Sequence, residues 1–384
     1  MLKDSAPTPS LDGPRPARAG ELDAILDAAN AVMRLESGSP PSIAGDYPFI
    51  YNEDNLGNIM IVKDGDRVVA TVAIWTNDIQ VGLARLKVGG INCVATRSGY
   101  RGRGLATLVM RAAHQRLGEL RCQVGRLTTN ISKWYRRLGW EFAGSKCYFD
   151  FNHSNVDLLP QLPIDVMIEC TPCPFEDETL QALLELHHGD RLGGVRTVAL
   201  TRTLFKSGNS PRARADARIV MARRRDTAVA YLIDRGGTIT EWGGKAEIVS
   251  GLLRAWFEQD VGRPALDREL DAQTRVAGSE RMTMIAPRAG HPLINGLEPL
   301  SLPCRYEYWG MLYILDPRGT LDAFGLHDIT VHESDGRFTL TRGRAQVTVN
   351  RPQLAKLLFG PERISDFAGD VLPVTFWQWP LEHV

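Results

Sequence analysis

The chain has 384 residues, of which 43% are hydrophobic and 23% are charged. These values are typical of a folded protein with two or three domains, and they exclude the fibrous and low-complexity classes. The 45 basic and 45 acidic residues balance, so the overall field does not favour nucleic acid or an anionic membrane surface. No apolar run approaches the roughly 20 residues of a membrane span, and the first residues lack the apolar core of a secretion signal. We therefore expect a cytoplasmic protein.

Cysteine and histidine spacing gives no metal site. Six cysteines in a chain of this length indicate a reducing compartment rather than a disulfide scaffold. Cys170 and Cys173 have the spacing of half a zinc site, but no second ligand pair follows them. The adjacent His187 and His188 would face apart on a helix, and we interpret them as surface residues. We therefore predict no bound metal.

The first predicted elements follow a short tail. Residues 1–13 are rich in Pro, Ser and Asp, and we expect them to be mobile. Apolar residues at helical spacing predict an amphipathic helix over 20–36. Two runs of strand-forming residues around Asp64–Gly65 predict a hairpin over 58–76, and 84–96 continues as a further strand.

A related pattern returns 160 residues later. Residues 218–234 predict a second hairpin, and both hairpins contain D-x-x-V-A, at 66–70 and at 226–230. A strand over 238–242 then leads through Gly243–Gly244 into an amphipathic helix. We infer from this order that the fold is duplicated.

A third segment closes the chain. Residues 337–349 predict a strand pair about Arg342–Gly343. A helix follows, with Pro352 in its first turn and Gly360 at its end. A hydrophobic tail over 371–384 completes the sequence.

The stretch with the clearest chemistry is 91–120, where a strand enters a basic, glycine-rich loop and then a helix. The loop, Gly99 to Gly104, precedes the helix, whose first N–H groups and dipole can bind phosphate oxygens. Glycine lets a ligand approach the backbone closely, while Arg97, Arg101 and Arg103 add charge. The pattern indicates a polyanionic ligand.

The charge distribution around this loop is uneven. Residues 85–146 contain 13 basic and two acidic side chains, a net charge of +11, whereas residues 1–84 contain six basic and 12 acidic ones, a net charge of −6. A polyanionic cofactor and a cationic substrate could meet between the two regions. A solvated arginine-rich helix face would explain the basic region alone.

The segment R-G-R-G-L-A at 101–106 resembles the R-x-x-G-x-A cofactor signature of the GNAT superfamily of N-acetyltransferases. Its strand, loop and helix context agrees with that signature. The resemblance implies acetyl-CoA as co-substrate, with the loop amides and the preceding strand holding its pyrophosphate and pantetheine. The implied residues are Val94, Ala95 and Thr96 at the pantetheine and Arg101, Gly102, Arg103 and Gly104 at the phosphates, with Ala106 completing the signature.

A second motif resembles the same family. S-K-W-Y-R-R-L-G-W is similar to the Y-x-R-x-G-[FYW] segment, whose tyrosine lies beside the departing thiolate of CoA, and Tyr135 is the matching residue. A phenol with a pKa near 10 can donate a proton to a thiolate with a pKa of roughly 8.5. A tyrosine that only packs beneath the sheet is the alternative. We assign Trp134, Leu138 and Trp140 to the core.

The order of the parts resembles the enhanced intracellular survival (Eis-like) family. This resemblance implies an α/β (α+β) protein with tandem acetyltransferase-fold mixed sheets flanked by helices, plus a small α+β sterol-carrier-like C-terminal domain. The expected domains are a catalytic acetyl-CoA-binding domain at 14–160, a second copy without the cofactor motif at 161–308, and the small domain at 309–384. The family also implies a homo-oligomer, a trimer-based hexamer.

In the same family the terminal α-carboxylate enters the acetyltransferase cleft and serves as general base. Here that residue is Val384, with Phe376 to Leu381 as its apolar anchor and Glu382 as a second candidate carboxylate. The alternative is that the tail only covers the third domain. The ending Glu-His-Val departs from family members that end in an aromatic residue.

The implied reaction is direct acetyl transfer from acetyl-CoA to an amine, on a small molecule or a peptide, with Tyr135 as acid and Val384 as base. An acyl-enzyme on Cys93 would want a histidine nearby, and none is close in sequence. Two other classes stay open: a CoA-binding or small-molecule-sensing protein without turnover, and a lipid carrier that acts through the last domain.

Overall fold

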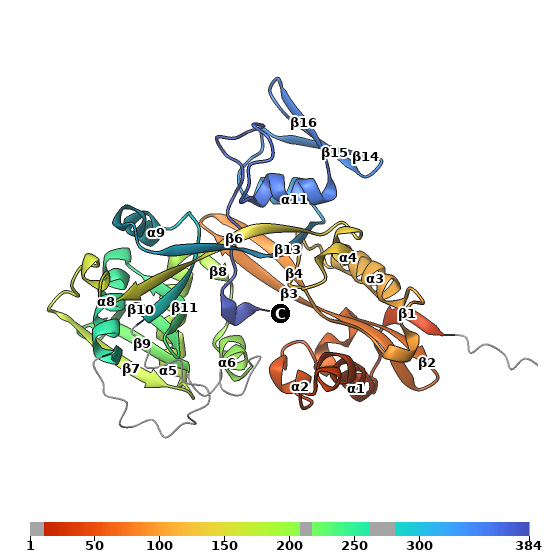
Figure 1. Cartoon of the computed structure of the whole chain (residues 1–384), viewed down its shortest axis with the longest axis horizontal. Helices are drawn as coiled ribbons and strands as arrows, with labels where there is room; N and C mark the ends of the chain where they lie inside the picture. Colours follow the sequence, from red (N-terminus) through yellow and green to blue (C-terminus); the bar gives the residue numbers. More distant parts are fainter. Residues whose placement is uncertain (1–10, 208–216, 262–280, 384) are drawn as a thin grey trace, which may run out of the picture.

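The computed structural model describes residues 11–207, 217–261 and 281–383. Thirteen of the described strands form one mixed sheet, flanked by helices (Figure 1). This confirms the predicted α/β class, although the strands of the two repeats join in one continuous sheet. None of the described helices is long and apolar enough to cross a membrane.

The first repeat contains the predicted helix, hairpin and strand. Strand β1 begins at Asp12, within the range expected to be a mobile tail, and residues 1–10 of that range lie outside the described part. The strands are β1 (Asp12–Pro16), β2 (Ile59–Asp64), β3 (Arg67–Val81), β4 (Ala84–Thr96), β5 (Val124–Leu127) and β6 (Glu141–Asn152). The helices are α1 (Leu22–Met33), α2 (Ile43–Asp46), α3 (Leu105–Glu119) and α4 (Ser132–Arg136), with 3-10 turns η1 (Leu35–Ser37), η2 (Glu53–Asn58), η3 (Ser98–Tyr100) and η4 (Val156–Leu158).

The second repeat follows the same order, as the duplicated sequence pattern predicts, except that strand β8 lies between its first two helices. Its strands are β7 (Val166–Pro172), β8 (Leu192–Gly194), β9 (Ala217–Arg224), β10 (Thr227–Arg235), β11 (Thr238–Gly244), β12 (Arg281–Pro287) and β13 (Cys304–Ile314). Its helices are α5 (Asp177–Asp190), α6 (Val198–Lys206), α8 (Ala246–Val261) and α9 (Pro292–Leu297), followed by the 3-10 turn η6 (Glu298–Leu300).

The strand order of the large sheet is nearly symmetric about its centre. It runs β1-β2-β3-β4-β5-β13-β6-β12-β11-β10-β9-β7, and β8 pairs with β3. The β4–β5 and β11–β12 pairs are parallel, and the other pairs are antiparallel. The last strand of each repeat, β6 or β13, therefore lies beside the penultimate strand of the other repeat. This exchange holds the two repeats together through backbone hydrogen bonds.

A small unit follows β13. It contains helix α10 (Pro317–Ala323), an antiparallel sheet of β14 (Thr330–Ser334), β15 (Arg337–Arg342) and β16 (Ala345–Asn350), and helix α11 (Arg351–Phe359). The predicted strand pair and helix are confirmed. Asn350 and Gln353 form a capping box at the start of α11, and Gly360, with a φ of 58°, ends it. Helix α11 packs against β6 and β13.

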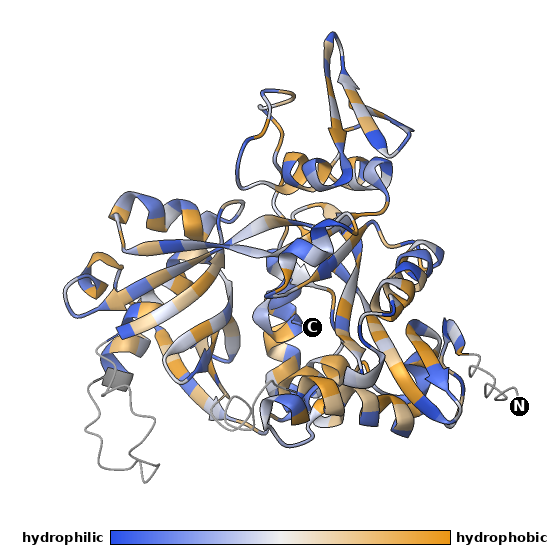
Figure 2. Ribbon diagram, turned by 45° about the vertical axis from the view of Figure 1, so that its right-hand side comes forward, coloured by the Kyte–Doolittle hydropathy of each residue, from blue (hydrophilic) through white to orange (hydrophobic). Residues whose placement is uncertain are grey.

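The apolar side chains form connected cores on both faces of the large sheet, and the strands are correspondingly hydrophobic in Figure 2. One core places α3 against β2, β3 and β4. Another contains residues of α1, α5 and α6 together with Leu381 of the tail, so it spans both repeats. Burial of this shared core ties the position of the tail to both repeats.

The core around α3 contains a histidine that we expect to destabilise the protein in acid. His114 Nε2 accepts a hydrogen bond from Trp140 Nε1 at 2.9 Å, and burial, helped by the charge of Arg351, lowers its pKa to about 4. In the unfolded chain the imidazole is protonated near pH 6.5. The stability that the neutral, buried His114 contributes is therefore fully present above pH 6.5 and is lost as the pH falls toward 4.

We expect His114→Gln, which keeps an acceptor for Trp140, to lose less stability on acidification. The difference between the wild-type and variant changes in unfolding free energy from pH 7 to pH 5 should be about 2 kcal/mol, measured by urea denaturation. Equal changes in the two proteins would contradict this assignment.

Candidate active site

The central feature of the site is a fork between two parallel strands. Strand β4 pairs with β5 only from Val88 to Gly90, where Gly90 lies opposite Arg126. Beyond Gly90, β4 continues to Thr96 and still pairs with β3, but the described part of β5 offers it no further ladder partner. The backbone N–H and C=O groups along this edge are therefore available to an extended ligand.

A bulge bends β4 at this open edge. The segment Thr71–Ala73 of β3 faces the longer segment Asn92–Ala95 of β4, and Cys93 has a positive φ of 44°. A non-glycine residue in this conformation is uncommon and is often found at functional sites. Of the predicted pantetheine residues, Val94 lies in the bulge, Ala95 is buried opposite Thr71, and Thr96 ends the strand.

The thiol at the bulge is not poised for nucleophilic attack. Burial raises the pKa of Cys93 to about 11, against the smaller opposing effect of a hydrogen bond with Tyr51. Tyr51 also donates a hydrogen bond from its hydroxyl to Asn92 Oδ1 at 3.0 Å. A thiol that stays protonated at neutral pH does not favour the acyl-cysteine alternative.

The glycine-rich loop lies between the fork and α3, as the sequence predicts. Gly102 and Gly104 have φ values of 77° and 78°, a conformation that favours glycine. Gly104 is the N-cap of the 15-residue helix α3, no side chain caps this end, and the first turn contains no acidic residue. A β-carbon at either glycine would meet open space, so a ligand can approach the backbone. These features fit phosphate oxygens.

Two of the three predicted loop arginines are exposed beside these glycines. Arg103 donates to Gly99 O at 3.2 Å and lies over the Tyr100 ring, and Arg101 pairs with Glu36 at 2.5 Å. Arg97, the third of them, was expected to add charge for the ligand, but it is buried. Its guanidinium bonds Val68 O and Asp27, so its hydrogen bonds are made within the protein.

The predicted acid, Tyr135, lies on α4 and is 6% exposed. Burial, followed by the influence of Cys93, raises its pKa to about 12. Its ring meets Trp134 edge-on at 4.7 Å, and among the described residues its hydroxyl has no hydrogen-bond partner. Cys93 and the Tyr135 phenol are therefore near one another, and the phenol is protonated at neutral pH. Trp140 is fully buried, as predicted.

The hydrophobic tail lies between the two repeats rather than over the small unit alone. Its 3-10 turn η7 (Pro380–Glu382) contacts β11 and α6 (Figure 1). Trp377 and Trp379 are buried in the core of the second repeat, and His383 packs near Trp309. Val384, the predicted base, lies outside the described residues.

Glu382, the second candidate carboxylate, is fully buried and bonded within the second repeat. Burial raises its pKa, against the opposing charge of Arg196. The surface interpretation of His187 was wrong: its Nδ1 accepts from Arg196 at 2.8 Å and its Nε2 donates to Gly194 O at 2.7 Å. His188 is exposed, but its ring lies edge-on to that of His187 with centroids 5.4 Å apart, so the two rings do not face apart.

Sequence reasoning did not identify Arg126, which lies at the point where the fork opens. Its side chain is fully buried, and its three nitrogens have no hydrogen-bond acceptor in the described part of the chain. The guanidinium lies 4.9 Å from the Trp309 ring centroid. Burial lowers its pKa to about 10, so it remains charged at neutral pH. The sequence signal that could have identified it is an arginine within the short, otherwise apolar strand V-G-R-L, because a buried arginine is rare.

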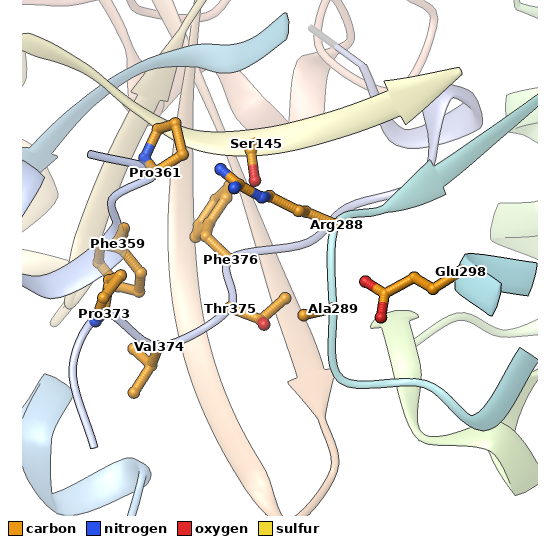
Figure 3. A pocket seen from close by; sticks show the side chains of 10 residues that line it. All are labelled: Ser145, Arg288, Ala289, Glu298, Phe359, Pro361, Pro373, Val374, Thr375 and Phe376. Carbon is orange, nitrogen blue, oxygen red and sulfur yellow. The ribbon is translucent and has the colours of Figure 1, made fainter. Parts of the chain in front are cut away.

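Two hollows lie away from the fork. One, of 240 Å³, lies between β6, the loop after β12 and the segment that follows α11, lined by Ser145, Arg288, Phe359 and Phe376 among others (Figure 3). It is smaller than most small-molecule sites. The other, of 710 Å³, lies in the second repeat at the start of α8.

The second repeat differs from the first at the corresponding helix. There the Gly244 N–H, just before α8, donates to the Asp190 carboxylate at 2.7 Å. The Asp190 carboxylate thus accepts the hydrogen bond of a backbone N–H at the position where the loop amides of the first repeat are free. A phosphate would meet a negative charge there.

The class of domain follows from these features and from a sequence comparison. Residues 14–143 match the family model described as the acetyltransferase (GNAT) domain. The chain therefore contains a GNAT acetyltransferase domain, which supports acyl transfer. No curated protein matches the sequence significantly.

Solved structures resemble nearly the whole chain. A GCN5-related N-acetyltransferase from Kribbella flavida has a TM-score of 0.59 and 17% identity, with 89% of this chain and 83% of that chain covered. One from Anabaena variabilis ATCC 29413 has a TM-score of 0.59 and 15% identity, with 91% and 89% covered. Eis1 from Mycobacterium abscessus has a TM-score of 0.59 and 14% identity, with 92% and 90% covered. At this identity the likeness concerns the fold.

Proposed function

We propose that this chain is an acetyl-CoA-dependent N-acetyltransferase that acetylates an amine by direct attack. The β4–β5 fork beside the uncapped start of α3 carries this proposal. It offers an extended ligand first an open strand edge and then, in the loop that follows, free backbone amides. The pantetheine would bind along Val94, Ala95 and Thr96. The phosphates would bind at the loop from Arg101 to Gly104, with Ala106 in the first turn of α3.

In the proposed reaction the amine nitrogen attacks the thioester carbonyl, and the carbon–sulfur bond breaks. Tyr135 protonates the departing thiolate, and a carboxylate accepts the proton that the amine loses. The raised pKa of Tyr135 supports its role as acid, since the phenol holds its proton until it is needed. The thiol of Cys93 is not used.

We assign the base to the terminal carboxylate of Val384. The described tail supports this assignment, because His383 lies beside Trp309 and near Arg126 at the mouth of the fork. A charged, buried guanidinium there would favour a carboxylate nearby. Glu382 already accepts a hydrogen bond from Gly194 and forms an ion pair with Arg196, which argues against it as the base.

The Eis-like organisation is part of the proposal, with domains at 14–160, 161–308 and 309–384. The Asp190–Gly244 contact supports a second repeat that does not bind CoA. We propose an aliphatic amine or a peptide lysine as acceptor.

The test of this function is CoA release from acetyl-CoA with a panel of amines, combined with calorimetric titration of CoA. Turnover of any amine supports the proposal. CoA binding without turnover of any amine favours a binding or sensing protein instead.

The loop assignment makes a further prediction. We expect Arg103→Gln to raise the Kd for CoA about tenfold, because a charge-assisted hydrogen bond to a phosphate contributes roughly 1.5 kcal/mol or more. Arg111→Gln is the matched control, since Arg111 is an exposed arginine further along α3. Equal effects of the two substitutions would assign the loss to general charge rather than to the loop.

A further inference from the structure

The tail that leads to the fork docks on β8 of the second repeat. Trp379 donates from its indole Nε1 to Leu192 O at 2.8 Å. Its ring is perpendicular to those of Trp377 and Trp242, with centroids 5.2 and 5.3 Å away. These contacts hold the tail by both a directed hydrogen bond and close aromatic packing.

Two glycines of β8 make this contact sterically feasible. A β-carbon on Gly193 would overlap the Trp379 indole, and one on Gly194 would overlap the Glu382 carboxylate. Strand β8 pairs in turn with β3 of the first repeat, where Gly194 lies opposite Ile79. The docking strand is therefore fixed to the sheet that carries the fork.

The Glu382 carboxylate is held by several donors. The Gly194 N–H approaches its Oε1 and Oε2 at 2.9 and 3.0 Å, and the Trp379 N–H bonds Oε2 at 3.1 Å. Arg196 Nε lies 3.3 Å from Oε1, and both side chains are fully buried. A buried carboxylate without such donors would be costly, so these groups fix it in one place.

Arg196 is itself held by a second carboxylate. It pairs with Glu241, which also accepts a hydrogen bond from the Tyr231 hydroxyl at 2.9 Å. His187 contacts both Arg196 and Glu241. The Arg196 guanidinium therefore joins the core of the second repeat to Glu382 of the tail. The next residue, His383, packs near Trp309.

We infer that Glu382 and Arg196 are positioning residues: together they anchor the tail so that His383 lies beside Trp309 and Arg126, where the fork of the first repeat opens. The second repeat thus contributes to the reaction as the anchor of the tail, without binding CoA. The catalytic part of this inference rests on the proposed function. The anchoring part stands on the contacts alone.

The test compares Glu382→Gln with a matched control, Asp234→Asn. Asp234 is also fully buried, pairs with Arg218 and accepts from the Gly237 N–H at 2.8 Å, and both of these partners belong to the second repeat rather than to the tail. The readouts are kcat, the KM for acetyl-CoA, and release of His383 by a carboxypeptidase, followed by intact mass. Thermal unfolding of both variants reports on the fold.

We expect Glu382→Gln to lower kcat at least tenfold with the KM for acetyl-CoA within twofold, and to speed the release of His383 at least tenfold. Asp234→Asn should lower the melting temperature but leave kcat and release unchanged. Arg196→Lys should retain more kcat than Arg196→Met, because it keeps the charge that faces Glu382.

Release of His383 at the wild-type rate from Glu382→Gln would overturn the anchor. An unchanged kcat together with faster release would overturn the positioning role. If the wild type acetylates no amine, the proposed function fails separately, and the release experiment still decides the anchor.

Discussion

Tyr135→Phe is expected to lower kcat for acetyl transfer about 100-fold, within the range for loss of a general acid. The substitution removes one oxygen from a ring that packs against Trp134 and leaves that packing in place. The KM for acetyl-CoA should change little, because the hydroxyl acts on charge that develops at the sulfur only as the bond breaks. Steady-state assays of CoA release measure both constants.

The control for this substitution is Tyr51→Phe. Tyr51 is a second buried tyrosine beside Cys93, but its hydroxyl is committed to Asn92. We expect its loss to affect stability more than kcat. Since the pKa of Tyr135 is about 12, no loss of activity from its ionisation should appear below pH 10. A Tyr135→Phe enzyme with wild-type kcat would remove the phenol from the mechanism.

Local sequence patterns predicted the elements well but not their partners. The hairpin at Asp64–Gly65 and the capped helix at 351–359 follow from turn residues and periodicity, which act over a few positions. The exchange of β6 and β13 does not, because an apolar strand has the same pattern whichever neighbour it pairs with. A repeated sequence could indicate two folds but not one shared sheet.

The same distinction applies to the site. The glycine-rich loop at 99–104 and the helix that follows it could be predicted, since both depend on contiguous residues. The roles of the loop and of Tyr135 in binding and catalysis stay predictions. Arg97 was expected to add charge at the loop because sequence does not give the direction of a side chain, and its partner Asp27 is 70 residues away. The contact of Glu382 with Gly194 joins residues 188 positions apart, so no local pattern indicates it.

Extending the chain by one glycine after Val384 is expected to lower kcat at least tenfold. The extension keeps a terminal carboxylate but moves it by about 3.5 Å, which takes it out of hydrogen-bonding reach of the amine. An amine with a pKa near 10 is only about 0.1% unprotonated at pH 7, so the variant should depend on this small fraction. Its rate should therefore rise more steeply with pH than that of the wild type.

Val384→Ala is the matched control, because it changes the last side chain and keeps the carboxylate in place. We expect its kcat to stay within twofold of the wild type. The two variants differ in the position of one charge rather than in the apolar anchor, since Phe376, Trp377 and Trp379 are unchanged and buried in both. If the extended enzyme kept both the wild-type kcat and its pH profile, the base would have to be sought elsewhere. If Val384→Ala lost as much activity as the extension, the terminal side chain, rather than its carboxylate, would matter.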